Sequence, residues 1–168
     1  MERDAMLRNL VLFCLLILAG CGFQPVYSGG QTGDTTHAKA ASVRVQPARD
    51  RIGQLVHNAL VARLNPGGQP RDPAYLLSLQ IEEDVRETGF RKDETSTRAN
   101  LEVEALYMLV DAATRQVVSR GRARSINSAN TLDQPYATTV AERDARERGA
   151  NDIAQQIARD IMSQLAAR

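Results

Sequence analysis

The segment YLLSLQIEEDV at residues 75–85 decides the fold class, because its apolar side chains recur at every second position. In an extended chain, successive side chains point to opposite faces, so this alternation gives one apolar and one polar face. Such a strand packs one face on a core and leaves the other in water, as antiparallel sheets do. The apolar series comprises Tyr75, Leu77, Leu79, Ile81 and Val85.

Three more segments carry the same alternation. Long strands are predicted from about Thr97 to Asp111 and from about Arg115 to Ile126, joined by a turn at residues 112–114. The charged stretch from Arg86 to Ser96 predicts an extended hairpin loop between the first two long strands. Residues 42–46, with valine at every second position, predict a short strand earlier in the chain.

Two amphipathic helices complete the pattern. Asp50 is positioned to cap a helix that ends near Leu64, where apolar residues recur at spacings of three and four. A second helix is predicted from about Ala137 to the end of the chain. Its apolar stripe comprises Ile153, Ile157, Ile161 and Leu165.

The order of elements is therefore strand, helix, three strands, helix. Two helices on one face of a sheet bury every apolar stripe described above. We predict an α+β fold with two helices packed on one face of a roughly four-stranded mixed or antiparallel sheet. The second face of that sheet is expected to remain exposed.

The first 20 residues have the layout of a secretory signal: a basic start, an unbroken apolar run from Leu10 to Leu18, and two small residues. The run is too short to span a bilayer, which takes roughly 20 residues. The sequence Leu18-Ala19-Gly20-Cys21 resembles the lipobox of bacterial lipoproteins. That resemblance implies cleavage before Cys21 and acylation of this residue. The residue after Cys21 is glycine and not the aspartate of inner-membrane retention, which points to the outer membrane, periplasmic side.

These features divide the chain into three parts. Residues 1–20 are expected to be a lipoprotein signal peptide, and residues 21–41 a lipidated N-terminus and flexible tether, rich in Gly, Thr and Ala. Residues 42–168 are expected to form a single α+β domain, because the chain without its signal is long enough for one core.

Composition argues against several function classes. The net charge is +1 and aromatic residues make up 4% of the chain, so neither a global field nor stacking platforms favour nucleic acid. His37 and His57 lie in no metal-ligand spacing, and Cys14 and Cys21 fall in the leader and at the acylation site. We therefore expect no metal, no cofactor and no enzymatic activity.

A basic stripe is predicted on the outward face of the last strand, where Arg120, Arg122 and Arg124 alternate with inward residues and are edged by Val118 and Ile126. Guanidinium groups beside aliphatic side chains could hold an anionic amphiphile.

Ordinary cross-strand ion pairs are the alternative interpretation of this stripe. With a three-residue turn, Glu104 lies opposite Arg122 and Glu102 opposite Arg124. Arg120 then faces Leu106 and is left without a counter-charge.

Three further residues, in two segments, are predicted to contact a partner protein. Phe90 and Arg91 lie at the tip of the first hairpin, where the alternative is a solvated loop. Phe23 lies in an apolar segment broken by Pro25 that we interpret as extended.

The chain resembles the lipopolysaccharide-assembly lipoprotein family, LptE. The resemblance rests on LAGCGFQP at residues 18–25, on GQLVHNAL at 53–60 followed by LNP at 64–66, on the long strand pair, and on YAT at 136–138. It implies a non-enzymatic subunit inside or beneath the outer-membrane β-barrel of the lipopolysaccharide translocon, which helps that barrel fold and interacts with lipopolysaccharide. Membrane attachment would be through the N-terminal lipid. A generic lipid-binding or transport-accessory periplasmic lipoprotein, with an internal apolar pocket, is the alternative function.

Overall fold

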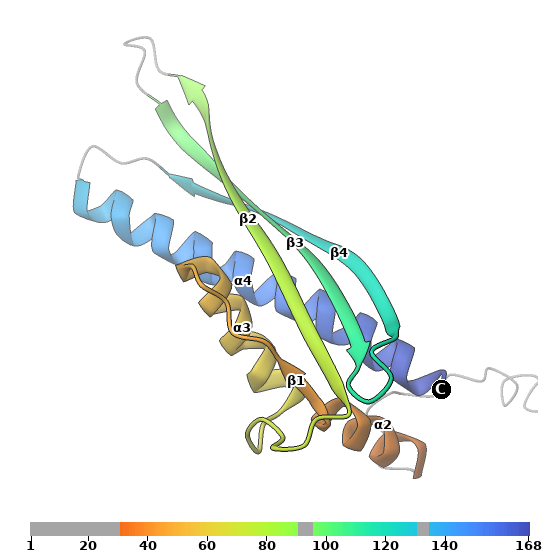
Figure 1. Cartoon of the computed structure of the whole chain (residues 1–168). Coiled ribbons are helices and arrows are strands. Elements are labelled where there is room, and N and C mark those ends of the chain that lie inside the picture. Colours follow the sequence, from red (N-terminus) through yellow and green to blue (C-terminus); the bar gives the residue numbers. More distant parts are fainter. Residues whose placement is uncertain (1–30, 91–95, 131–134) are drawn as a thin grey trace, which may run out of the picture. The chain divides into compact units, whose positions relative to one another are not determined.

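The computed structural model describes residues 31–90, 96–130 and 135–168, which contain one four-stranded mixed sheet and three helices (Figure 1). The strands are β1 (Val43–Val45), β2 (Tyr75–Phe90), β3 (Ser96–Asp111) and β4 (Val117–Asn130), in that spatial order. The helices are α2 (Gln31–Ala41), α3 (Arg51–Leu64) and α4 (Pro135–Ala166). Strand β1 pairs parallel to β2, and the other two pairings are antiparallel. The predicted α+β class is confirmed.

Helices α3 and α4 cover one face of the sheet, and α4 runs along β3 and β4 beside α3 (Figure 1). The apolar stripe of α4 makes this contact: Ile153, Ile157 and Ile161 are completely buried against inward residues such as Val103 and Leu109. The second face of the sheet carries exposed side chains, among them Leu106 and Met108 of β3. No helix in the described ranges is both long and apolar enough to cross a bilayer.

Side-chain hydrogen bonds stabilise both ends of helix α3. Asp50 is its N-cap and accepts from the backbone N–H of Gly53 at 2.6 Å, as the sequence predicted. At the other end, the buried Asn65 donates to the carbonyl oxygens of Ala41 and Val43, both at 3.0 Å. These bonds tie the end of α3 to the chain that enters β1.

The prediction of a flexible tether is wrong for residues 31–41, which form α2. The segment lacks apolar periodicity, so its sequence gave no helix signal. Contacts with distant parts of the fold stabilise it instead: Ala40 is buried in the core, and the Lys39 ammonium donates to the Leu165 carbonyl at 3.2 Å. Residues 21–30 lie outside the described residues, and the division into domains remains a prediction.

The first hairpin is longer than the sequence predicted. Residues 86–96 were expected to form its loop, but β2 continues to Phe90 and β3 starts at Ser96, with Arg86 aligned to Asn100. Strand β4 likewise extends past Ile126 to Asn130. Alternation of large apolar residues weakens in these segments, whereas backbone hydrogen bonds between strands do not depend on it.

Replacing Ile157 by aspartate tests the buried face of α4. The variant places an uncompensated carboxylate among apolar side chains, so we expect a loss of roughly 3–5 kcal/mol in the free energy of unfolding. The matched control is Gln155→Asp, which introduces the same residue at an exposed position of the same helix and should change stability little. Thermal or urea unfolding measures both, and equal stabilities would contradict the packing described here.

Candidate functional site

The outward face of the sheet is ordered in transverse rows, because each β3 residue is aligned with one residue of β2 and one of β4. Two adjacent rows combine a polar, an apolar and a cationic side chain: Gln80, Leu106 and Arg122 in one, and Ser78, Met108 and Arg120 in the other. The sequence supplies this arrangement by placing outward residues at every second position of all three strands.

These two rows line a shallow groove of about 650 Å³. Its floor is apolar, since Leu106 is 43% and Met108 40% exposed. Arg120 and Arg122 lie along its β4 side, and Ser78 and Gln80 along its β2 side. We refer to this feature as the sheet groove. It combines exposed aliphatic surface with cationic groups, which are the two properties that an anionic amphiphile requires.

Two of the three predicted arginines form the expected ion pairs. Arg122 lies 3.2 Å from the Glu104 carboxylate, and Arg124 bonds to Glu102. The hydrogen bond from Arg124 is the largest cause that lowers the pKa of Glu102 below its ordinary value. The predicted register is nevertheless wrong: Glu104 is aligned with Arg124, so both pairs reach diagonally across the strands.

The register differs because the β3–β4 connection is longer and less regular than a three-residue turn. The Asp111 N–H donates to the Gln116 carbonyl at 2.9 Å, so the turn holds four residues, among them Arg115 with φ 60°. A bulge then inserts one more residue on β4, at the shift beside Leu109 and Val110. The turn and the bulge together add two residues to the predicted connection. Because side chains alternate with a period of two, Arg122 and Arg124 still face outward and can still pair with the glutamates.

The bulge also changes which of two adjacent valines faces outward. Val118 was expected to face outward, but it packs against the core, and its neighbour Val117 is 47% exposed instead. Beyond the bulge the predicted alternation holds, with Ala123 buried and Ile126 56% exposed.

Arg120 differs from its two neighbours. It is exposed, and it has no hydrogen bond or ion pair within the described part of the chain. The sequence predicted this lack of a counter-charge, although the residue aligned with Arg120 is Met108 and not Leu106.

Of the other predicted site residues, Phe90 alone belongs to an element that the structure describes. Phe90 is the last residue of β2, aligned with Ser96 and ten positions along the strand from Gln80. Cys21, Phe23 and Arg91 lie outside the described residues.

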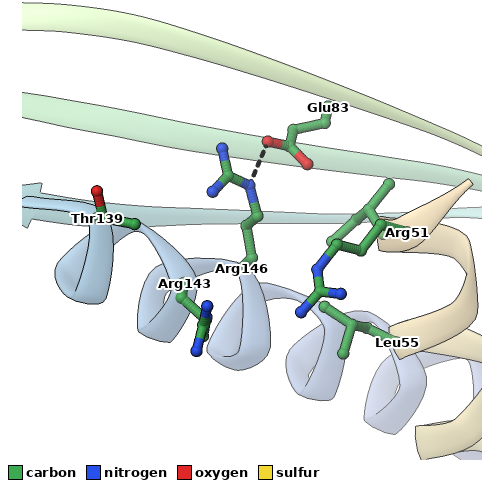
Figure 2. A pocket seen from close by; sticks show the side chains of 7 residues that line it. Arg51, Leu55, Glu83, Thr139, Arg143 and Arg146 are labelled. Atoms are coloured by element: carbon green, nitrogen blue, oxygen red, sulfur yellow. Dashed lines mark hydrogen bonds and ion pairs between the residues drawn. The ribbon is translucent and has the colours of Figure 1, made fainter.

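A second hollow, which the sequence did not predict, lies on the helix-covered side of the sheet (Figure 2). We call it the arginine pocket. It has a volume of about 280 Å³ and is lined by Arg51 and Leu55 with Ile52 from α3, Glu83 from β2, and Thr139, Arg143 and Arg146 from α4. Only the spacing of residues 139, 143 and 146 on one helix face could have suggested it. The contributions of α3 and β2 come from distant parts of the sequence.

One ion pair crosses the arginine pocket. Arg146 Nε donates to Glu83 Oε1 at 2.8 Å (Figure 2). A second nitrogen of the same guanidinium lies 3.5 Å from Glu142. The hydrogen bond to Glu83 is the largest cause that raises the pKa of Arg146.

Both hollows open to the surface, and neither is the enclosed apolar pocket that a generic lipid carrier would use. Within the described ranges, no group of three or more His, Cys, Asp and Glu side chains is placed to hold a metal ion. Among the described residues, the hydrogen-bond partners of His57 are the polar side chains of Asn58 and Gln69.

Comparison with known proteins gives one family match. A family model described as lipopolysaccharide-assembly, LptE, matches residues 40–165, which is most of the chain. Comparison with curated proteins finds no match.

Several solved structures are similar to this one. A crystal structure of a protein from Caulobacter crescentus is 30% identical, covers 79% of this chain and 96% of its own, and gives a TM-score of 0.67. A minor lipoprotein from Acinetobacter baumannii is 15% identical over 72% of this chain and 90% of its own, with a TM-score of 0.51. Rare lipoprotein B from Shewanella oneidensis is 12% identical over 72% and 95%, with a TM-score of 0.50. The last two similarities show the fold alone.

Proposed function

The chain belongs to the lipopolysaccharide-assembly family LptE, and from that premise we propose that it is a non-enzymatic subunit of the outer-membrane lipopolysaccharide translocon. In this role it assembles with the translocon β-barrel, plugs it, and contacts lipopolysaccharide during insertion of the glycolipid into the outer membrane. Acylation of Cys21 holds it on the periplasmic face of that membrane.

The sheet groove is the observation that supports glycolipid contact. A lipopolysaccharide headgroup presents phosphates beside acyl chains, so a protein that binds it needs charge-assisted donors next to aliphatic surface. The groove offers Arg120 and Arg122 beside Leu106 and Met108. Helices cover the other face of the sheet and leave this one accessible.

The three arginines are not equivalent in this proposal. A phosphate that approaches Arg122 or Arg124 must compete with Glu104 or Glu102 for the guanidinium. A phosphate at Arg120 displaces no carboxylate. Arg120 should therefore supply the largest share of the electrostatic contribution to glycolipid binding.

Charge reversal tests this ranking. The protein without residues 1–21 is titrated with lipopolysaccharide at two salt concentrations, because a phosphate contact weakens as salt screens it. We expect Arg120→Glu to weaken binding by about tenfold or more, the value of a charge-assisted hydrogen bond, and Arg124→Glu to weaken it less.

Arg159→Glu is the remote control, since Arg159 is an exposed arginine of α4 outside the sheet groove. Binding that is unaffected by salt and by charge reversal of Arg120, Arg122 or Arg124 would exclude this groove as the glycolipid site. The outward face would then be left as a contact for the barrel wall.

Exposed apolar side chains on the same face support assembly with a protein partner. Leu106, Met108, Val117 and Ile126 are each between 40% and 56% exposed. Apolar surface of this kind marks interaction sites when it is contiguous. Phe90, Arg91 and Phe23 remain additional candidates for contact with the barrel.

Affinity purification tests the partner directly. Native protein with a C-terminal tag is captured from detergent-solubilised outer membrane, and we expect one large β-barrel protein to co-purify in near-equal amount. Another tagged outer-membrane lipoprotein serves as the control for nonspecific capture. Recovery of the chain alone, under conditions that keep other outer-membrane complexes intact, would argue against a translocon subunit.

Metabolic labelling with a radioactive fatty acid tests the anchor. Cys21→Ser removes the thiol that would carry the diacylglycerol, so the variant should incorporate no label and should stay unprocessed or be released into the periplasm. One acyl chain binds a membrane only marginally, whereas two or more bind stably. A labelled serine variant would show that Cys21 is not the attachment site.

A further inference from the structure

The arginine pocket is independent of the sheet groove. The two hollows share no lining residue, and they lie on opposite faces of the sheet, one among outward side chains and the other where α3 and α4 meet β2. An inference drawn from the arginine pocket therefore does not rest on the proposed glycolipid contact.

The charges that line the arginine pocket do not balance. Arg146 is matched by Glu83 and by Glu142. Arg51 and Arg143 have neither a hydrogen bond nor an ion pair within the described part of the chain. Two guanidinium groups are thus left without a counter-charge beside one hollow, whose lining residues carry three positive charges and one negative.

We propose that the arginine pocket binds a phosphate monoester carried by a small organic or lipid molecule. A phosphate monoester bears a charge of about −1.5 to −2 at pH 7, which matches the two unbalanced guanidinium groups. A single carboxylate would balance only one of them. Guanidinium groups bind phosphate oxygens through paired, charge-assisted hydrogen bonds, and such bonds fix the orientation of the group.

Apolar side chains around the arginine pocket can contact the organic part of the ligand. Ile52 and Leu55 belong to its lining. Val140 is three residues before Arg143 and Tyr136 seven, so both share a face of α4 with it. Val140 is 47% and Tyr136 82% exposed. Ile52 and Leu55 place apolar surface beside the cationic groups, and Val140 and Tyr136 add exposed surface on the helix face that carries Arg143.

Binding is measured by isothermal titration of the full-length protein in a non-ionic detergent. The probes are inorganic phosphate, glycerol 3-phosphate and lysophosphatidic acid, with succinate as a dicarboxylate control. We expect Arg51→Gln and Arg143→Gln each to weaken binding of glycerol 3-phosphate by about tenfold or more, as the loss of a charge-assisted hydrogen bond implies.

The matched control is Arg159→Gln. Arg159 is exposed on the same helix, also lacks a partner among the described residues, and lies 16 residues from Arg143, or roughly 24 Å along the helix axis. Its replacement changes the net charge equally and should alter binding less than twofold. Because all three arginines are exposed and unpaired, their variants should keep the melting temperature of the parent protein.

A fourth variant should change affinity in the opposite direction. Glu83→Gln removes the carboxylate that occupies Arg146 and lowers the negative charge beside the arginine pocket. Binding of glycerol 3-phosphate should tighten severalfold. A merely structural role for these residues would not produce weaker binding in two variants and tighter binding in another.

The probes also separate the possible sources of the phosphate. Tighter binding of lysophosphatidic acid than of glycerol 3-phosphate supports a lipid headgroup, and equal binding of the two supports a soluble phosphate ester. Absence of binding, equal affinity for succinate, or equal weakening by Arg159→Gln would each overturn the proposal. None of these results depends on whether lipopolysaccharide binds the sheet groove.

Discussion

Close packing of α4 on β3 and β4 is the constraint on which the rest of the structure depends. A helix can approach these strands closely because β4 presents small inward residues, Gly121 and Ala123 among them. A Cβ atom at Gly121 would lie 2.6 Å from Cζ of the Tyr107 ring. The absence of that atom lets Tyr107 extend over β4 and donate a hydrogen bond to Asp160 of α4 at 3.2 Å. Burial is the largest cause that raises the pKa of this phenol, so Tyr107 remains a neutral donor.

This packing also determines where the two hollows form. Because α4 packs on one face of the sheet, every second residue of β2, β3 and β4 faces the other side. Some of these outward residues line the sheet groove. The arginine pocket forms at the amino-terminal half of α4, which precedes the buried isoleucines. There Arg146 meets Glu83 of β2. Both hollows thus follow from where the apolar stripe of α4 begins and which face it covers.

Alternation and helical periodicity were enough to predict the class of the fold, the faces of its strands outside the bulge at Val118, and the pairing of Arg122 and Arg124 with glutamates. They could not predict register, because a four-residue turn and a bulge depend on backbone conformations, such as that of Arg115, that leave no periodic signal. Helix α2 and the arginine pocket were missed for a different reason. Each is held together by residues far apart in sequence, as the bond from Lys39 to Leu165 illustrates, and periodicity reports only on local order.

Net charge is equally uninformative about the proposed sites, because the 21 basic and 20 acidic residues nearly cancel. Lack of an ion-pair partner does not identify a site either, since exposed Arg159 shares that property. What distinguishes Arg120, Arg51 and Arg143 is that each borders a hollow with apolar lining. A paired arginine that binds a phosphate must give up its carboxylate, so the exchange adds little net attraction, whereas an unpaired one contributes its full interaction. Ligand affinity in this chain should therefore follow the local pairing of arginines rather than their number.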